Sequence, residues 1–426
     1  MKVLIMSHNP ITDYNNMGKT FLSLFEDFSS NELCQFYIYP TIPNVKKCGS
    51  YFRITDKDAL KNIFSINKKG REISIEEIKN ENSLYENESE QNIYKEKSSH
   101  KELKLVARNF IWKLGGNTKK LDQWIKEQKP DVIFAAAGLS SFFYDFILKI
   151  SKKHSLPIVS YVCDDFYFSS ELLLKGVIKK VYYKALRKKV AKLMRNSKTV
   201  TTICDSLGKA YQNEFGCNTL TVSTGATIDI ASKANESDAK VIRYFGNLQL
   251  GRNNSLLSLG KALDKINEEQ NSKYSLEIYT DESRPDILQP FSEILSIQIK
   301  GFVSGDEVHR LMKDSLALVH TESFESKNIE RVRFSVSTKI ADSLASGTAL
   351  LAFGPAEVAS MEYLIENEAA FCATSAEELT EVLKELITNK DKKEKIISNA
   401  LESAKKNHDS KKNSVMMKET LEEACR

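Results

Sequence analysis

The stretch "FSVSTKIADSLASGTALLAFGP", residues 334–355, decides the fold. Its middle predicts a helix that begins after Ser337 and ends at Gly347, a residue typical of helix C-termini. The apolar run "ALLAF" follows at once and predicts a buried strand. A helix that leads straight into a buried strand is the repeating unit of a parallel sheet.

The same alternation fills most of the chain and restarts after a polar stretch, "DIASKANESDA", at residues 229–239. Strands such as "VLIMS", "DVIFAAA" and "LALVH" are apolar throughout, as strands are when helices cover both faces of a parallel sheet. We therefore expect an α/β protein with two Rossmann-like parallel-sheet domains facing a cleft. Its ligands should bind at the carboxyl ends of the strands.

The length of 426 residues also favours two domains, because one hydrophobic core rarely grows that large. We expect an N-terminal domain over residues 1–228, a C-terminal domain over 238–405 and a last helix over 406–426. Residues 45–104 include a long polar stretch with few apolar side chains, and we predict that most of this segment is a mobile insertion.

The composition is that of a globular protein, with 41% hydrophobic and 28% charged residues. No apolar run approaches the roughly 18 residues that a membrane-spanning helix needs. The chain begins like a strand rather than a secretion signal, and its seven cysteines form no CxxC pair. We expect a cytoplasmic protein with reduced thiols and no zinc site. The net charge of +4 does not by itself indicate nucleic acid.

The motif "GKT" at the start of a helix near the N-terminus invites an ATPase interpretation, which fails. A P-loop has a second glycine five residues before the first residue of this motif, and here that position holds Asp13. What remains is Gly18 and Lys19 at a helix N-terminus, where free amides can meet an anion. A plain turn into a helix with an asparagine cap is the alternative.

Two later stretches predict a binding site for a diphosphate. In "VIRYFGNLQLGR", Gly246 allows close approach of a ligand, and Arg252 can place two donors on phosphate oxygens. In residues 334–355, two hydroxyls and Lys339 stand at a helix start, whose free amides and positive dipole end favour an anion. The candidates for this site are Gly246, Asn247, Arg252, Glu325, Ser337, Thr338, Lys339 and Asp342.

The chain resembles the bacterial retaining glycosyltransferases of the GT-B fold, of the group-1 or family-4 type. The resemblance rests on "YFGNLQLGR", "GFVSGDEVHRLMKDSLALVHTESFE" and "STKIADSLASGTALLAFGP", in order and well spaced. It implies that the C-terminal domain binds a nucleotide-diphosphosugar, with Arg252 and Lys339 on the diphosphate and Asp342 on the ribose. It also implies that the last helix crosses back to the N-terminal domain, although a simple extension of the C-terminal domain is the alternative.

The sequence departs from the family pattern at several positions. Phe334 occupies the place of the first Glu of the family's E-x7-E motif, and a longer loop separates Glu325 from the helix. In the first half, "YVCDDFY" places Asp164 and Asp165 where relatives have a His-Asp pair. These two carboxylates and His8 after the first strand are candidates for the cleft. A helix cap and a packed histidine are the respective alternatives.

A basic helix is predicted within "LLLKGVIKKVYYKALRKKVAKLMRN", residues 172–196. Apolar residues including Val177, Ile178 and Val181 form one face. Lysines and arginines fill much of the rest, which indicates either a core-packed helix with a solvated face or a helix that docks on anionic lipid. In "RNFIWKL", Phe110 and Trp112 would add an apolar wedge. The membrane-facing candidates are Lys179, Lys180, Arg187 and Lys188.

We expect a glycosyltransferase of the hexosyltransferase type that takes its sugar from a nucleotide-diphosphosugar, with UDP-sugars favoured. It would act on a lipid-linked, glycan or protein acceptor in bacterial surface glycan synthesis, peripherally at the inner face of the membrane. No Asp-x-Asp metal motif follows a strand, so no metal or other cofactor is expected. The catalytic candidates are Arg252, Lys339, Asp164 and Asp165, and His8, Gly18 and Lys19 lie on the acceptor side. The alternative is a catalytically silent GT-B-like subunit that stabilises a partner glycosyltransferase.

Overall fold

The computed structural model describes residues 1–13, 16–65, 69–78, 101–168, 176–235 and 239–426. The chain divides into two compact units. The N-terminal unit consists of Met1–Thr224 with Ser410–Arg426, and the C-terminal unit consists of Gly225–Asp409. The divisions lie a few residues from the expected ones at 228 and 406.

The sheet of the N-terminal unit has the strand order β4-β3-β2-β1-β5-β6-β7-β8 among the described residues. All neighbours pair in parallel except β4, which runs antiparallel to β3. The expected strands of this half are present, and β1 is buried along its whole length because helices cover both faces. The strands are β1 Val3–Ser7, β2 Leu33–Tyr37, β3 Ser50–Arg53, β4 Arg71–Ile73, β5 Val132–Ala136, β6 Ile158–Val162, β7 Thr199–Thr202 and β8 Thr219–Thr221.

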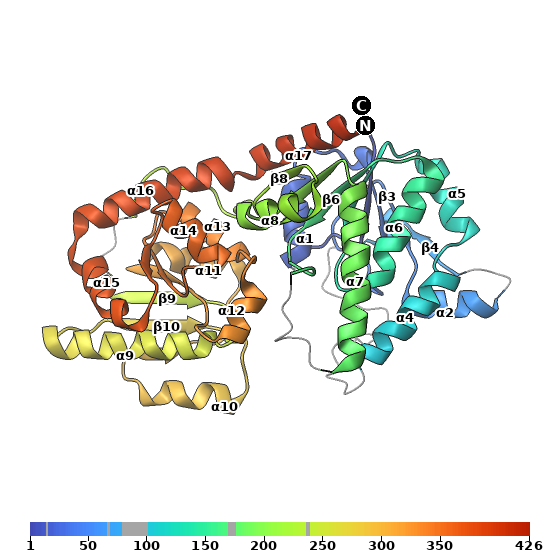
Figure 1. Cartoon of the computed structure of the whole chain (residues 1–426). Helices are drawn as coiled ribbons and strands as arrows, with labels where there is room; N and C mark the ends of the chain where they lie inside the picture. Colours follow the sequence, from blue (N-terminus) through green and yellow to red (C-terminus); the bar gives the residue numbers. More distant parts are fainter. Residues whose placement is uncertain (14–15, 66–68, 79–100, 169–175, 236–238) are drawn as a thin grey trace. The chain divides into compact units, whose positions relative to one another are not determined.

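Two groups of helices pack against this sheet (Figure 1). On one face, α1 packs against α17, and their apolar residues share one core with β1 and β5. Elsewhere, α4 contacts α2, α6 and α7. The helices are α1 Asn16–Leu24, α2 Asp56–Phe64, α4 Lys101–Gly115, α5 Lys119–Gln128, α6 Ser141–His154, α7 Val177–Asn196, α8 Asp205–Phe215 and α17 Ser410–Cys425, with 3-10 turns η1 Ser30–Glu32 and η2 Ile75–Glu77.

The prediction of a mobile insertion over residues 45–104 was wrong for much of its first half. This first half contains β3, α2, β4 and η2. Helix α4 begins at Lys101, just before the end of the segment. Tyr51 and Ile54 are fully buried, and Thr55 caps α2 by accepting a hydrogen bond from the Asp58 amide. The short apolar run "SYFRI" was the missed signal, since a strand of this length shows little periodicity. Residues 79–100, the most polar part, lie outside the described residues.

The sheet of the C-terminal unit is parallel throughout, with the order β11-β10-β9-β12-β13-β14. This is the Rossmann order 3-2-1-4-5-6, in which the direction of winding reverses between β9 and β12. The strands are β9 Val241–Phe245, β10 Ser275–Tyr279, β11 Ile297–Ile299, β12 Ala317–Thr321, β13 Leu350–Phe353 and β14 Phe371–Ala373. Each coincides with an expected strand.

Helices cover both faces of this second sheet (Figure 1) and enclose two apolar cores. One core includes Leu256 and Leu263 of α9, and the other includes Ile340 and Leu344 of α13. The helices are α9 Arg252–Gln270, α10 Pro285–Leu288, α11 Gly305–Lys313, α12 Ser326–Val332, α13 Thr338–Ala345, α14 Ala359–Glu366, α15 Ala376–Thr388 and α16 Lys390–Asn407, with a 3-10 turn η4 Gln289–Glu293.

The last helix, α17, belongs to the N-terminal unit by its packing. Met417 and Leu421 are fully buried in the N-terminal core. The Lys418 ammonium lies 2.7 Å from the Glu32 carboxylate, and the Ser414 hydroxyl accepts a hydrogen bond from the Asp27 amide at 2.9 Å. None of the seven cysteines, all of which lie in the described part of the chain, forms a disulfide. No helix in the described part of the chain is long and apolar enough to cross a membrane.

Candidate active site

A buried ion pair lies at the winding reversal of the C-terminal sheet. Arg252 is the first residue of α9, which follows β9, and Glu322 comes directly after β12. The guanidinium donates to the Glu322 carboxylate from Nη2 at 3.0 Å and from Nε at 3.2 Å. The Glu322 side chain is 3% exposed and the Arg252 side chain 17%. Parallel sheets bind ligands at such a reversal, so this is where a ligand-binding residue is expected.

The Arg252 guanidinium is held in place with part of its donor capacity unused. A third hydrogen bond runs from Nη1 to the Asn247 side-chain oxygen at 3.2 Å. The bonds to described residues therefore use three of the five N–H groups and leave one on each terminal nitrogen. Burial opposes the charged form, but Glu322 outweighs it, so the pKa of Arg252 is raised. The cation is permanent and preoriented, as binding of a phosphate requires.

Two positions in the loop before Arg252 have no room for a side chain. Gly251 has a φ of 77°, and a Cβ there would lie 2.4 Å from the Ser323 hydroxyl oxygen. At Gly246 it is a neighbouring side chain, and not the backbone conformation, that leaves no room for a Cβ. A Cβ on it would lie 2.7 Å from the Tyr244 hydroxyl, which donates to the Asn247 carbonyl at 2.7 Å. The two glycines thus let this loop pack closely on its own residues and on the loop after β12.

His320 on β12 connects the ion pair with the second expected cation. Its Nε2 lies 3.0 Å from the Ser360 hydroxyl and 3.8 Å from the Glu322 carboxylate. Burial lowers the pKa of His320 to about 4, with Glu322 opposing and both Arg252 and Lys339 adding to the decrease. The ring is therefore neutral at pH 7.

The helix predicted over residues 338–347 is α13, and its N-terminus is open. Ser337 is the cap residue, but its hydroxyl makes no capping hydrogen bond. Ser337 and Thr338 are half-buried, and Lys339 is exposed. The amides and dipole of this helix start thus add to the positive charge of Lys339.

The two acidic candidates of this unit already accept hydrogen bonds from other residues of the protein. Asp342 accepts hydrogen bonds from the Thr227 amide at 2.6 Å and from the Thr227 hydroxyl at 3.0 Å. Glu325 is exposed, and its carboxylate accepts from Asn254 at 3.1 Å and Asn328 at 3.0 Å. Both side chains therefore fasten loops to helices. The expected roles of Asp342 on a ribose and of Glu325 on a sugar stay predictions.

The N-terminal sheet has a corresponding reversal between β1 and β5, where His8 lies. A Cβ on Gly138, after β5, would lie 3.3 Å from the His8 ring, and the Phe143 ring packs edge-on at 4.9 Å. Burial lowers the pKa of His8 to about 3, with Arg108 adding to the decrease and Asp56 opposing it. The His8 Nε2 is buried without a hydrogen-bond partner. His8 is thus a neutral group at the expected end of the sheet.

Two further residues at this reversal escaped prediction. The Arg108 guanidinium donates to Asp56 at 2.9 Å and to the Ser140 hydroxyl at 2.6 Å, and the Trp112 indole donates to the same carboxylate at 2.6 Å. Asp56 begins α2 and Arg108 lies on α4, which a sequence pattern cannot place beside β1. The capping signal "TDKD" before α2 would have revealed at least that helix.

The other candidates of the N-terminal unit have structural contacts. Gly18 lies in the first turn of α1, where a Cβ would approach the Thr12 carbonyl oxygen within 2.0 Å, so the glycine permits close packing. Lys19 is exposed. Asp165 accepts from the amides of Tyr167 at 2.8 Å and Phe168 at 2.9 Å.

These contacts leave the two adjacent carboxylates in different environments. Burial raises the pKa of Asp165 despite the two amides and the Tyr211 hydroxyl at 3.4 Å. Asp164 is exposed. Asp165 thus orders the loop after β6 by binding backbone amides, which resembles the helix cap considered as its alternative role. Asp164 is the more accessible of the two.

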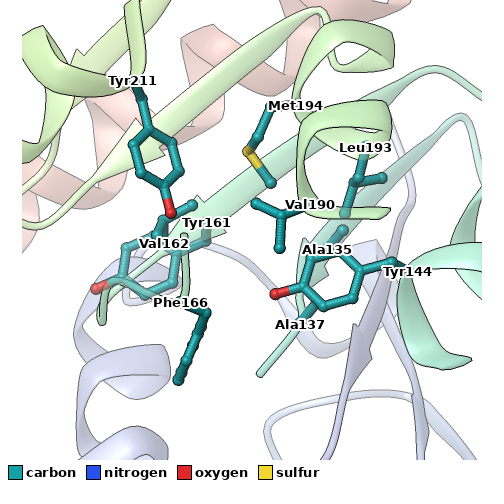
Figure 2. Close-up of a pocket in the computed structure, with 10 residues that line it drawn as sticks. All are labelled: Ala135, Ala137, Tyr144, Tyr161, Val162, Phe166, Val190, Leu193, Met194 and Tyr211. Carbon is teal, nitrogen blue, oxygen red and sulfur yellow. The ribbon is translucent and has the colours of Figure 1, made fainter. Parts of the chain in front are cut away.

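A small cavity lies beside this loop (Figure 2). Tyr144 of α6, Tyr161 of β6 and Tyr211 of α8 surround it, together with apolar side chains of α7. Its volume is about 10 Å³, which is room for about one water molecule and too little for a sugar ring. The cavity is therefore a packing feature of the core and not an acceptor site.

Comparison with known proteins finds one family match and many structures of similar fold. A glycosyl transferase-like family model matches residues 261–419, which include Glu322, Lys339 and Asp342. No curated protein matches the chain. Among solved structures, Anabaena HepE in complex with UDP aligns with a TM-score of 0.64 at 13% identity, over 99% of this chain and 100% of that chain.

Two other solved structures show the same architecture. The UDP-forming α,α-trehalose-phosphate synthase of Burkholderia xenovorans aligns with a TM-score of 0.63 at 10% identity, over 100% of both chains. The sucrose-phosphate synthase of Thermosynechococcus elongatus aligns with a TM-score of 0.61 at 9% identity, over 99% of this chain and 98% of that chain. The chain has the GT-B fold. Within this GT-B fold, residues 261–419 are the part that matches the glycosyl transferase-like family model.

Within the described residues, no group of three or more His, Cys, Asp or Glu side chains is placed to hold a metal ion. The most informative residues that the sequence did not reveal are Glu322 and His320. Both lie at the carboxyl end of β12, and a systematic search of strand ends for charged residues would have found them.

Proposed function

We propose that this GT-B protein transfers a sugar from a UDP-sugar to an acceptor hydroxyl. The observation that carries the proposal is the preoriented Arg252, held by buried Glu322 at the winding reversal, with two N–H groups unused. Anabaena HepE binds UDP-glucose in the same fold, and the trehalose-phosphate synthase is UDP-forming, which favours UDP as the leaving group here.

The chemistry follows from where charge develops. Breaking the bond between the anomeric carbon and the β-phosphate oxygen places negative charge on the departing UDP and positive charge on the sugar ring. Donors that are fixed before the reaction stabilise such charge most effectively. We assign this role to Arg252, Lys339 and the open N-terminus of α13. Because these groups supply positive charge themselves, we propose that transfer does not require a metal ion.

Glu322 and His320 act through Arg252 in this mechanism. Glu322 fixes the guanidinium by two hydrogen bonds and compensates its charge when no ligand is bound. His320 is neutral, so it does not compete with the Arg252 guanidinium for the Glu322 carboxylate. Asp342 would contact the ribose. We also propose that the anomeric configuration is retained, because the sequence resembles retaining glycosyltransferases.

On the acceptor side we propose a lipid-linked, glycan or protein acceptor of bacterial surface glycan synthesis. At the N-terminal reversal, His8 lies against the Phe143 ring, and the Arg108 guanidinium, paired with Asp56, lies over the Phe142 ring. Sugars bind well to such a mixture of aromatic faces and hydrogen-bonding groups. Asp164 is the more exposed of the two adjacent carboxylates after β6.

The first experiment measures binding of UDP and GDP to the full chain by calorimetry and then release of UDP from UDP-sugars with and without acceptors. The proposal expects UDP to bind and at least one UDP-sugar to be consumed. A chain that binds neither nucleotide and consumes no UDP- or GDP-sugar would contradict it and favour the silent subunit. Addition of a chelator should leave turnover unchanged.

A further inference from the structure

The N-terminal unit exposes apolar side chains along two adjacent helices, α4 and α7. Phe110 on α4 is 63% exposed, and Val177 and Val181 on α7 are 77% and 63% exposed. Val106, Leu114 and Ile178 are exposed as well. Soluble proteins rarely expose a continuous apolar patch without a function for it. We call these six residues, with the exposed lysines between them, the α4–α7 face.

The sequence left open whether the apolar face of the basic helix, with Val177, Ile178 and Val181, packs on the core or docks on lipid. In the structure these three side chains are exposed, and the buried residues of α7 are Tyr182, Leu186, Val190, Ala191, Leu193 and Met194. Trp112 was expected in an exposed wedge and is 2% exposed, stacked on Phe142. The reason is that the first turn of α7 extends past the core that its later turns contact.

The exposed apolar residues form stripes on helices that touch. Val106, Phe110 and Leu114 are spaced four apart, so they lie on one side of α4. Val177, Ile178 and Val181 share the first turns of α7. The two helices contact each other, and in Figure 1 α4 begins near the start of α7 and runs obliquely away from it. The α4–α7 face therefore presents apolar side chains from both helices.

Positive charge surrounds these apolar side chains. Helix α7 contains eight lysines and arginines and no acidic residue, and α4 contains four basic residues and one acidic residue. Of the four predicted membrane-facing residues, Lys180 and Lys188 are exposed, and Lys179 and Arg187 are half-buried. Lys113, Lys184 and Lys192 are also exposed. Of these helices' basic groups, Lys189 pairs with Asp145 and Arg108 with Asp56.

The combination of charge and apolar surface selects one kind of partner. A nucleic acid would use the lysines but would gain nothing from exposed valines and a phenylalanine away from its bases. A bilayer with anionic headgroups uses both, because lysines reach the headgroups while apolar side chains enter the acyl boundary. We propose that the α4–α7 face binds the surface of an anionic membrane. This inference does not depend on the transfer of a sugar.

The proposal is tested with vesicles and the full chain. Flotation is measured on phosphatidylcholine vesicles and on phosphatidylcholine mixed with phosphatidylglycerol, at low and high salt. Binding is expected only to the anionic vesicles and should weaken at high salt, because screening reduces the contribution of the lysines. Absence of binding to anionic vesicles at low salt would overturn the proposal.

Two variants of the face separate its two components. The triple change Lys180→Glu, Lys184→Glu and Lys188→Glu should weaken partitioning about 100-fold, at about 1 kcal/mol for each lysine. The double change Phe110→Ala and Val181→Ala should weaken it at least about tenfold through lost apolar contact. Because all five side chains are at the surface, both variants should fold, and UDP binding provides the check.

A matched control carries the same change in charge elsewhere. Lys261→Glu, Lys273→Glu and Lys390→Glu change exposed lysines of the C-terminal unit. This variant should keep its vesicle binding, and equal losses in both triple variants would overturn the assignment to this face. Light scattering without lipid tests the rival occupant, since a dimer that the double change dissociates would show that a second copy covers the face. A chain that binds vesicles but not UDP would contradict the proposed function alone.

Discussion

The winding reversals of the two sheets each contain an arginine–carboxylate pair, in different surroundings. In the C-terminal unit, Arg252 holds Glu322, which is 3% exposed, beside a neutral histidine and an open helix start. In the N-terminal unit, Arg108 holds Asp56, which is 31% exposed and also accepts from the Trp112 indole. The first pair keeps N–H groups for a ligand, whereas the second lies among aromatic rings.

If the proposed function is right, this difference lets one topology serve two kinds of ligand. A diphosphate needs fixed positive charge that is not fully neutralised, and the C-terminal reversal provides it. A neutral sugar needs ring faces and hydrogen-bonding groups without strong net charge, and the N-terminal reversal is closer to that description. The two arginines therefore allow a direct comparison of the two sites.

The largest effect is expected from Arg252→Ala. Loss of a fixed donor to the leaving group should reduce turnover about 10²–10³-fold. The variant also leaves buried Glu322 without its cation, which should lower the free energy of unfolding by about 3 kcal/mol. Initial rates of UDP release and urea unfolding of the full chain measure the two effects.

The double variant Arg252→Ala with Glu322→Gln separates these effects, because it removes the uncompensated charge. It should regain most of the lost stability and none of the activity. Arg108→Ala is the matched change at the other reversal and should leave the affinity for UDP unchanged. If Arg108→Ala weakened UDP binding as much as Arg252→Ala, the contrast between the two reversals would be wrong.

The second effect concerns Lys339→Ala. Lys339 is exposed, so its loss should not change the free energy of unfolding, but UDP binding should weaken about 10–100-fold through loss of a charged donor. Calorimetric titration with UDP provides the measurement. Lys327→Ala, an exposed lysine on α12, is the control and should bind UDP normally. Normal UDP binding by Lys339→Ala would remove α13 from the proposed site.

Most of the fold could be predicted from the sequence, and the reason is visible in particular strands. Runs such as "LALVH" and "ALLAF" are apolar throughout, because both faces of a parallel sheet are buried, and every expected strand of the C-terminal unit is present. The strand β3 was missed because its four residues lie next to a polar segment and show no clear period.

The candidate site could be predicted only in part. Arg252 and the α13 start were recognisable, since a glycine-containing loop before a helix and a helix start after a loop have local signatures. Glu322, Asp56 and Arg108 were not, because their importance comes from partners at 70, 52 and 52 positions away in the sequence. Pairings at such separations are set by the order of the strands, which the sequence does not state directly.

The third effect is a dependence of stability on pH that comes from His320. The pKa of His320 is about 4 in the folded chain against 6.5 for an unperturbed histidine. Between these values the unfolded chain binds an additional proton, so stability rises with pH across this window and is lost as the pH falls. His320→Gln should reduce the slope by up to about 1.4 kcal/mol per pH unit.

Urea unfolding at several pH values between 4 and 7 measures this slope. The parent chain, measured at the same pH values, supplies the control. His8 is buried at the other reversal, and its pKa of about 3 predicts a loss of slope of the same sign for His8→Gln. A slope unchanged in His320→Gln would mean that this ring is accessible to protons in the folded state.

The smallest effect distinguishes two roles of Asp342. Its carboxylate accepts from the Thr227 amide and hydroxyl, so Thr227→Val should cost about 1 kcal/mol of stability by removing one of these bonds. If Asp342 also holds a ribose, Asp342→Ala should cost similar stability and in addition weaken UDP binding about three- to tenfold. Thr227→Val should leave UDP binding unchanged. Since both residues belong to the C-terminal unit, UDP titration of the two variants compares them directly. Equal UDP affinity in both variants would reduce Asp342 to a support for its loop, and the contrast between the reversals would then depend on Arg252 and Lys339 alone.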